Sequence, residues 1–525
     1  MFVQFLGKCF HNYSNKKNKY LYMKPREIFI KTAAFVLLFI AFISFFWPPV
    51  LWSLLFFVPV ILVGIMDIAQ TKHTIKNNFP VIGHFRYLLE SFRPEIQQYF
   101  VETDMEGTPI NRMFRSLIYS RAKNENDTTP FGTKSDVYRI GYECMTHSMY
   151  PKKADEVEHN PRILIGGKDC KQPYNSSILN ISAMSFGALS QNAVLALNKG
   201  AKLGEFAHNT GEGGISPYHL EGGGDLIWQV GTGYFGCRTA DGNFCEDTFK
   251  RNASQENVKM IEIKLSQGAK PGHGGILPGA KNTEEIAKIR GVKPFTDVHS
   301  PPYHTAFSNA EGLMRFIQQL RELSNGKPVG FKLCVGSKEE FIDLCEAMKK
   351  TNISPDFITV DGGEGGTGAA PVEFSNSLGL PLREGLSFVV NALKNNDLKT
   401  DIKVIASGKV FSAFHMIRLL SLGADGINSA RAMMMAIGCI QALQCNTNKC
   451  PVGVATQNKS LMKGLDVNEK YIRVANYHKN IIHSFVEMLA ASGMSKSNEV
   501  KRKHILHRMG PNKLVSYQEL YPETI

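Results

Sequence analysis

No charged residue lies between Thr32 and Ile65 of this 525-residue chain. Such a stretch offers little for water to solvate, which excludes a position on the outside of a soluble domain. It is also too long for a single helix across a hydrocarbon layer of roughly 30 Å. Pro48 and Pro49 interrupt the stretch, and proline ends a helix because it lacks an N–H group and clashes with the preceding turn. We therefore predict a two-helix membrane hairpin over residues 32–66.

Lysine and arginine flank both ends of the predicted hairpin. The preceding residues, 1–31, form a basic segment, and Lys72 and Lys76 follow the second half. Because basic residues remain on the cytoplasmic side of a membrane, we expect both ends and the catalytic part of the chain in the cytoplasm. One alternative is a signal peptide, which usually has a shorter apolar region and a small-residue cleavage site. The other is a hairpin that enters the membrane from one face.

A long run of basic residues is also missing, although the net charge is +13. That distribution argues against a nucleic acid as partner, because a surface that binds nucleic acid concentrates its basic residues. The ten cysteines include no C-x2-C pair, which removes the usual ligand spacing of a structural zinc site. In the reducing cytoplasm these cysteines do not form a disulfide framework either.

The pattern of polar and apolar residues divides the remaining chain into three parts. Residues 67–160 are polar and irregular, and we expect them to pack as a lead-in segment on a larger domain. From residue 161 short apolar runs end in glycine, serine, aspartate or asparagine and alternate with amphipathic helical patterns, which is typical of an α/β domain. We predict this domain over residues 161–495 and a C-terminal tail over residues 496–525.

Eight short apolar runs predict the strands of a parallel sheet. They cover residues 178–185, 205–210, 227–231, 260–265, 328–334, 356–362, 403–408 and 425–430. Segments such as EEIAKIR and EEFIDLCEAMKK lie between them and are apolar at the spacing of one helix face. This alternation predicts a closed (β/α)8 barrel, the TIM barrel, in preference to an open sheet.

Small residues follow the last three predicted strands, at the end where such a barrel holds its active site. The three groups are Asp361, Gly362 and Gly363; Ser407, Gly408 and Lys409; and Ser429, Ala430 and Arg431. Glycine lets backbone N–H groups approach an anion closely, and late barrel loops often hold a phosphate. The pattern predicts a phosphate site for flavin mononucleotide (FMN), and ordinary tight turns are the alternative.

Three cysteines lie close together in the segment GCIQALQCNTNKCPVG. Cys439, Cys445 and Cys450 follow the spacing C-x5-C-x4-C. Three neighbouring thiolates are suited to an iron–sulfur cluster, whereas zinc usually requires a fourth ligand. Buried thiols without a metal are the alternative, because cysteine is among the most buried residue types.

A glycine-rich segment, IKLSQGAKPGHGGILPG, contains the end of the fourth predicted strand and carries Lys264 and Lys270. A lysine beside a flavin can hold a substrate carboxylate or an anionic reduced ring. Surface lysines on a turn are the alternative. For His273 and His304 the same two interpretations stay open.

These segments, together with SAMSFGALS, HNTGEGG, SPPYH and DGGEGGTGAAP, occur in the order found in glutamate synthase, a family that the chain resembles over about residues 110–490. The resemblance implies FMN, a three-iron (3Fe-4S) cluster on the three cysteines, and formation of L-glutamate from 2-oxoglutarate and ammonia through 2-iminoglutarate. Ammonia would be free or glutamine-derived. Electrons would enter through the cluster from a donor that the resemblance leaves open, namely ferredoxin, a reductase subunit or a membrane carrier. It also implies a short member without the amidotransferase domain.

The resemblance also assigns residues. It implies flavin contacts for Met184, Ser185 and Lys332, and phosphate contacts for Gly362, Gly363, Gly408 and Lys409. Near the oxo acid it implies Glu212, Lys264, Lys270 and Arg290. Positive groups suit a dicarboxylate, because each carboxylate requires a charge-assisted partner.

Two positions depart from the family pattern. Ile276 stands where the family has a loop glutamine, and Val292 stands where an acidic residue is expected. An apolar residue removes a hydrogen bond that a buried polar substrate would need. The alternatives are therefore a membrane-linked FMN and iron–sulfur oxidoreductase with another substrate, or a flavin redox module without catalysis.

Overall fold

The computed structural model describes residues 24–126 and 128–524. The chain divides into two compact units, Met1–Glu102 and Thr103–Ile525. The division falls inside the predicted lead-in segment, and residues 1–23 of the predicted basic segment lie outside the described residues.

The first unit contains an apolar helical hairpin. Helix α2 (Pro25–Ser44) begins with proline at its first position, where no N–H partner is needed. The 3-10 helix η1 (Pro48–Ser53) starts at the predicted proline break and leads into α3 (Leu54–Ala69). Phe29 of α2 packs on Gly64 of α3, where a Cβ atom would lie only 2.0 Å from the ring.

By length and composition, two segments of this hairpin are apolar enough to cross a membrane. They are Pro25–Ser44 and Pro48–Ala69, and only 6% of the most apolar part of each is buried. A helix of a soluble core would be mostly buried. Three shorter helical segments, α4 (Thr74–Asn78), α5 (Gly83–Ile96) and the π-helix η2 (Gln97–Val101), complete the unit.

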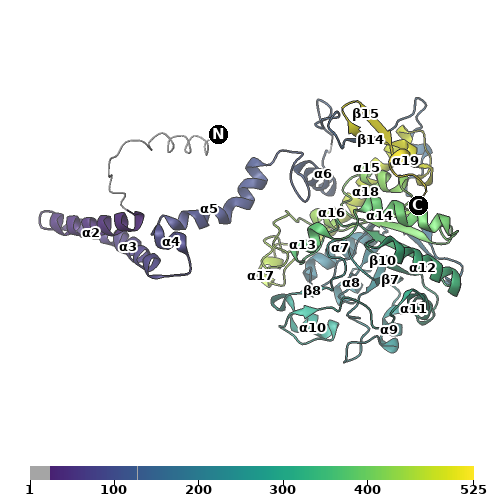
Figure 1. The fold of residues 1–525 in the computed structure, drawn as a ribbon, viewed down its shortest axis with the longest axis horizontal. Coiled ribbons are helices and arrows are strands. Elements are labelled where there is room, and N and C mark those ends of the chain that lie inside the picture. Colours follow the sequence, from purple (N-terminus) through teal and green to yellow (C-terminus); the bar gives the residue numbers. More distant parts are fainter. Residues whose placement is uncertain (1–23, 127, 525) are drawn as a thin grey trace. The chain divides into compact units, whose positions relative to one another are not determined.

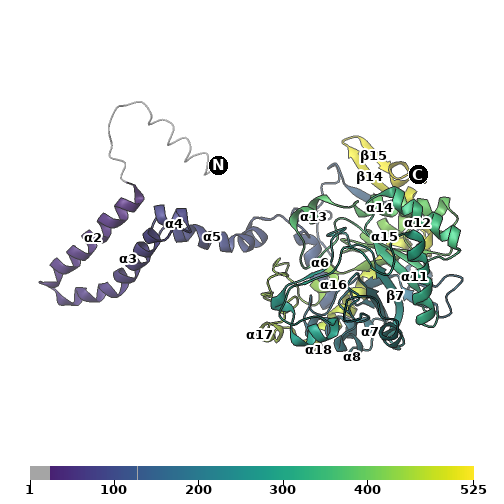
Figure 2. The same ribbon diagram turned by 60° about the horizontal axis from the view of Figure 1, so that its bottom comes forward.

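The second unit is built on a closed barrel of eight parallel strands (Figures 1 and 2). In chain order the strands are β4 (Leu179–Ile181), β5 (His208–Asn209), β6 (Leu226–Val230), β7 (Val258–Lys264), β10 (Val329–Leu333), β11 (Phe357–Asp361), β12 (Lys403–Ser407) and β13 (Gly426–Ser429). Each pairs with its neighbour in this order, and β13 pairs with β4 to close the ring. The predicted TIM barrel is confirmed.

Helices surround the barrel and lie in the loops that follow its strands. They are α7 (Gln191–Leu203), α8 (Pro217–Glu221), α9 (Glu246–Ala253), α10 (Glu284–Arg290), α11 (Ala310–Leu323), α12 (Lys338–Thr351), α13 (Val372–Ser377), α14 (Leu382–Asn395), α15 (Ala413–Ser421), α16 (Arg431–Ala436), α17 (Lys459–Met462) and α18 (Val467–Ala491). Short polar side chains cap several of their N-termini; Ser190, Thr283 and Asn309, for example, accept a backbone N–H of the first turn.

Three smaller sheets and two further helices belong to this unit. The hairpin of β2 (Arg162–Ile165) and β3 (Tyr174–Ser177) packs against residues at the amino ends of the barrel strands. The pair β8 (Ile276–Leu277) and β9 (Val298–His299) lies in loops that follow β7. The last strands, β14 (Ile505–Gly510) and β15 (Lys513–Ser516), pair with β1 (Glu143–Met145), and α6 (Arg112–Lys123) and α19 (Tyr517–Leu520) pack beside α18 and β15 respectively.

Candidate active site

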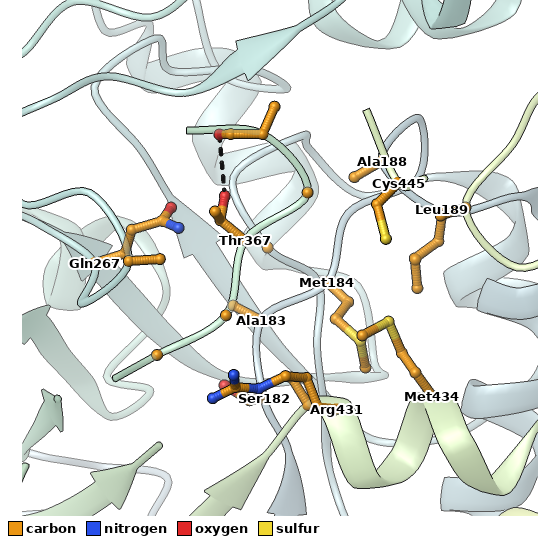
Figure 3. A pocket seen from close by; sticks show the side chains of 18 of the residues that line it. Ser182, Ala183, Met184, Ala188, Leu189, Gln267, Thr367, Arg431, Met434 and Cys445 are labelled. Atoms are coloured by element: carbon orange, nitrogen blue, oxygen red, sulfur yellow. Dashed lines mark hydrogen bonds between the residues drawn. The ribbon is translucent and has the colours of Figure 1, made fainter. Parts of the chain in front are cut away.

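A cavity of about 720 Å³ lies at the carboxyl ends of the barrel strands (Figure 3). Its wall includes the last residues of four strands, namely Lys264, Asp361, Ser407 and Ser429. This volume is in the range of sites that enclose a cofactor and a small substrate. The carboxyl end of a TIM barrel is the usual place of its active site.

The structure brings most of the predicted site residues to this cavity. They are Met184, Ser185, Glu212, Lys264, Lys270, Arg290, Lys332, Asp361, Ser407, Gly408, Lys409, Ser429, Ala430, Arg431, Cys439, Cys445 and Cys450. Gly362 and Gly363 do not line it. Their N–H groups donate to the carbonyls of Ser407 and Leu380, at 3.0 and 2.8 Å. These two N–H groups are therefore already used by the fold, and Gly365 and its neighbours line the cavity instead.

Glu212 and Lys264 form an ion pair in the cavity wall, with 3.0 Å between Oε1 and Nζ. Strand β7 delivers Lys264, and the segment after β5 delivers Glu212. Burial opposes ionisation of Glu212, but Lys264, Lys270 and Arg290 outweigh it and lower the pKa of that carboxyl. Burial lowers the pKa of Lys264 even though Glu212 acts against the shift. The pair places one carboxylate among three cations.

Lys270 and Arg290 supply the other two cations. Lys270 is 3% exposed, and its Nζ donates to the carbonyl of Ala369 at 2.9 Å. Burial lowers its pKa to about 8. Arg290 donates to the carbonyl of Phe186 at 3.2 Å, and burial lowers the pKa of its guanidinium to about 10. Buried cations of this kind suit an anionic ligand.

A second cationic group lies after the last two strands. Lys409 and Arg431 both line the cavity, and burial together with their mutual repulsion lowers the pKa of Lys409. Gly408 between strand and lysine has a φ of +145°, which a residue with a side chain rarely adopts. Arg431 also donates to the carbonyl of Glu364 at 2.7 Å. Two neighbouring cations beside a glycine turn suit an anionic group such as the predicted phosphate.

The three predicted thiols line the same cavity. Burial raises the pKa of Cys439 to about 12 and also raises that of Cys445, and in both cases the neighbouring thiols add to the effect. Among residues 24–126 and 128–524, no three His, Cys, Asp or Glu side chains are close enough together to hold a single metal ion. The 3Fe-4S cluster therefore stays a prediction. Figure 3 shows Met184 and Met434 pointing toward one another between Arg431 and Cys445.

Residues distant in sequence hold the thiol loop, and sequence reasoning did not find them. Tyr119 of α6 donates its hydroxyl to the carbonyl of Cys439 at 2.7 Å. The Gln441 side chain accepts the N–H of Ile110 at 3.1 Å, and Ile110 lines the cavity. The sequence predicted only that the lead-in segment packs on the barrel. It did not predict these contacts, because no local pattern specifies them.

Lys281 is a further residue that the sequence analysis missed. It is 2% exposed, and its Nζ donates to the carbonyls of Ala188 and Cys445, at 2.5 and 3.3 Å. Burial lowers its pKa to about 8, while Cys445 and Cys450 act in the opposite direction. A charge is thus buried next to the thiols, although the local sequence is typical of an exposed surface turn.

The structure also shows where the two histidines and the two departures from the family pattern lie. His304 is buried and supports β7 through a hydrogen bond to the carbonyl of Lys264 at 2.9 Å, and burial lowers its pKa to about 4. It lies behind the cavity, and His273 contacts Phe374 outside the cavity wall. Of the two departures from the family pattern, Ile276 lines the cavity, whereas Val292 packs against the hydrophobic core.

Comparisons with known proteins identify related sequences. The model of the conserved region in glutamate synthase matches residues 123–495. The glutamate synthase large subunit-like protein YerD of Bacillus subtilis (strain 168) is 38% identical in an alignment of 505 residues that covers 88% of this chain and 96% of YerD. The archaeal glutamate synthase (NADPH) of Methanocaldococcus jannaschii is 34% identical over 61% of this chain and 60% of its own length.

For longer relatives the match covers a smaller part of their own length. The glutamate synthase (NADPH) large chain of Azospirillum brasilense is 33% identical over 62% of this chain but only 21% of its own length. Among solved structures, the flavin-binding domain of baker's yeast flavocytochrome b2 is 13% identical, with a TM-score of 0.42 over 85% of this chain and 89% of that domain.

Proposed function

Because this chain belongs to the glutamate synthase family, we propose that it is an FMN-dependent oxidoreductase that forms L-glutamate from 2-oxoglutarate and ammonia through 2-iminoglutarate. The observation that carries the proposal is the cavity in which one carboxylate, Glu212, is surrounded by Lys264, Lys270 and Arg290. A dicarboxylic oxo acid requires cationic partners, and its imine nitrogen carries a positive charge that a carboxylate can hold.

Each side chain has a distinct role in this proposal. Lys270 and Arg290 bind the substrate carboxylates, since both are buried cations of the cavity wall. Glu212 holds ammonia or the protonated imine nitrogen, and Lys264 keeps that carboxylate ionised at a distance of 3.0 Å. When bound, FMN supplies the hydride. Lys409 and Arg431, which both line the cavity, hold its phosphate.

The three cysteines are proposed to hold a 3Fe-4S cluster that receives electrons from ferredoxin, a reductase subunit or a membrane carrier. Their position in the wall of the same cavity supports this, together with the buried Lys281, which can balance a cluster's negative charge. A low-temperature EPR spectrum tests it. The oxidised protein should give a three-iron signal that Cys445→Ser abolishes and Cys245→Ser, at a cysteine outside the cavity wall, retains.

We also propose that α2 and α3 anchor the protein in a membrane. Both ends of this hairpin, and the catalytic domain, lie in the cytoplasm. The support is the exposure of two apolar segments that meet at the proline turn. Ammonia then arrives free from the cytoplasm or from a glutaminase partner.

The decisive experiment uses the full-length protein under anaerobic conditions. The flavin is reduced with dithionite and mixed with 2-oxoglutarate and 15N-ammonium, and flavin absorbance and labelled glutamate are followed together. We expect reoxidation with formation of 15N-glutamate. The variant Lys270→Gln should lose most of this activity, whereas Lys288→Gln, at an exposed lysine of α10, should retain it.

One observation favours a second candidate. Ile276 lines the cavity where an amide is expected, and an apolar wall suits an oxo acid with a less polar side chain. Reoxidation by another oxo acid, with no response to 2-oxoglutarate, would replace the glutamate assignment with an oxidoreductase of the same fold. Bound FMN that no oxo acid reoxidises would leave a redox module.

A further inference from the structure

One face of α5 and η2 is apolar and exposed within the first unit. It comprises six residues, which we call the apolar stripe: Phe85, Leu88, Leu89, Phe92, Ile96 and Phe100. Each is between 42% and 85% exposed. Their spacing of three and four residues places them on one side of the helix. An apolar face of this length in contact with water is unfavourable, because removing apolar surface from water is stabilising.

The opposite side of α5 already has a partner. The ring of Tyr87 packs edge-on against His73 at a centroid distance of 5.4 Å, and Nζ of Lys76 lies 5.1 Å from the centre of the same ring. Tyr87 is two residues after Phe85 and so points to the other side of the helix. The contacts with α4 and the preceding loop therefore turn the apolar stripe outward.

Hydrogen bonds fix the beginning of α5 to the end of α3. Asp67, in the last turn of α3, accepts from the N–H of Val81 at 2.9 Å and contacts Nε2 of His84 at 2.9 Å. The side-chain amide of Asn77 donates to the carbonyl of Ile68 at 2.8 Å. Figures 1 and 2 show that α5 does not continue the direction of α3. The helix thus starts at the level where the second apolar segment ends and then turns away.

We propose that α5 and η2 lie in the plane of the membrane, with the apolar stripe in the interfacial layer of the cytoplasmic leaflet. The inference rests on the membrane hairpin proposed above, because α3 brings α5 to the surface of the bilayer. The partner is a lipid surface, into which an amphipathic helix inserts its apolar face by several ångströms. Arg86 and Arg93, each one residue after a member of the stripe, lie along one edge of it and reach anionic headgroups.

Fluorescence quenching tests the depth of α5. The full-length protein is reconstituted in vesicles of phosphatidylcholine and phosphatidylglycerol whose acyl chains carry bromine. A tryptophan is introduced either in the stripe, as Phe92→Trp, or next to it on another face, as Ser91→Trp; both positions are exposed. We expect bromine to remove most of the emission added by Phe92→Trp and little of that added by Ser91→Trp. Equal quenching of the two would overturn the proposal.

The unmodified protein shows whether the hairpin itself has entered the bilayer. Trp47 and Trp52 lie at or beside the 3-10 helix η1, where the two apolar segments meet, and Trp228 is buried in the barrel domain and provides a constant background. Quenched Trp47 and Trp52 with an unquenched Phe92→Trp variant would sink the in-plane helix alone. Unquenched Trp47 and Trp52 would sink the hairpin and, with it, this inference. Protection of the Phe92→Trp emission that grows with the protein-to-lipid ratio would show a second copy on the stripe and overturn the lipid contact.

Discussion

At the scale of single residues, the chemistry of the cavity depends on cations whose pKa values are lowered by burial. Lys270 and Lys281 are each almost fully buried, and burial lowers the pKa of each to about 8. One lies beside Glu212 and the other beside the thiols. A lysine with that pKa is cationic in neutral solution and loses its charge on modest alkalinisation, so both sites respond to pH and to single substitutions.

We expect the affinity for 2-oxoglutarate to fall as pH rises through about 8, because the pKa of Lys270 is lowered to that value and its deprotonation removes a cation from the site. A hydrogen bond to a charged group contributes about 1.5–3 kcal/mol, or roughly ten- to hundredfold in the dissociation constant. Calorimetric titration from pH 6.5 to 9.5 measures it. Lys270→Gln should bind weakly at every pH, while Lys288→Gln should follow the unmodified protein.

A second prediction concerns the lysine beside the thiols. Removing its charge with Lys281→Met should lower the reduction potential of a cluster on the three cysteines, because a nearby cation stabilises the more negative reduced state. Lys281→Arg should restore most of the potential. A redox titration followed by EPR measures the shift, and Lys449→Met provides the control, since Lys449 is exposed to solvent. No difference between the Lys281→Met and Lys449→Met variants would contradict the expectation.

At the scale of elements, the thiol loop depends on contacts from a segment that precedes the barrel. Gln441, Leu443 and Asn448 have positive φ angles of 60, 54 and 61°, which cost free energy in residues other than glycine. The hydrogen bonds of Gln441 and Tyr119 hold the loop in this conformation. The lead-in segment thus acts as a clamp on the candidate cluster site.

We expect Gln441→Leu to loosen this loop. The substitution leaves the buried N–H of Ile110 without its acceptor, which costs about 1–3 kcal/mol. Hydrogen–deuterium exchange should become faster over residues 439–450 and 108–119, without a change in the barrel strands. Gln444→Leu, at an exposed side chain of the same loop, should leave exchange unchanged. Unaltered exchange in the Gln441→Leu variant would show that the clamp does not depend on this side chain.

At the scale of the whole molecule, one buried carboxylate connects the beginning and the end of the second unit. Glu143 of β1 accepts hydrogen bonds from Arg383, from Arg418 at 2.6 Å and from Tyr517 at 2.7 Å. Its side chain is 6% exposed. Burial opposes ionisation, yet Arg418 and the other partners lower its pKa from 4.5 to about 2. The ionised carboxylate therefore stabilises the packing of the C-terminal strands on the barrel.

This network predicts an acid-sensitive contribution to stability. Since the folded state lowers the pKa of Glu143, the contribution is complete above about pH 4.5 and is lost as pH falls toward 2. Glu143→Gln should cost up to about 3 kcal/mol at pH 7, because two partly buried arginines lose their counter-charge. Urea unfolding followed by circular dichroism measures the loss. Glu523→Gln removes the exposed ion pair with Lys394 and should change stability by at most about 1 kcal/mol.

The sequence by itself determined the barrel and much of its site. Each strand is a short apolar run that ends in small or polar residues, so local periodicity was enough to find all eight strands of the closed barrel. Since parallel strands of a barrel point their carboxyl ends in one direction, residues such as Lys264, Asp361 and Ser407 were expected together, and they meet in one cavity. The absence of charge from Thr32 to Ile65 likewise identified the two apolar helices.

Only the tertiary structure decided which backbone groups remain available and which distant side chains reach the site. The N–H groups of Gly362 and Gly363 are used by neighbouring carbonyls, although their sequence matched a phosphate loop. Lys281 and Tyr119 reach the thiol loop from far along the chain. The physical reason is the range of the signals. The periodicity of strands and helices depends on residues that are close in the sequence. A hydrogen-bond partner or a buried charge depends instead on contacts that exist only after the barrel has closed.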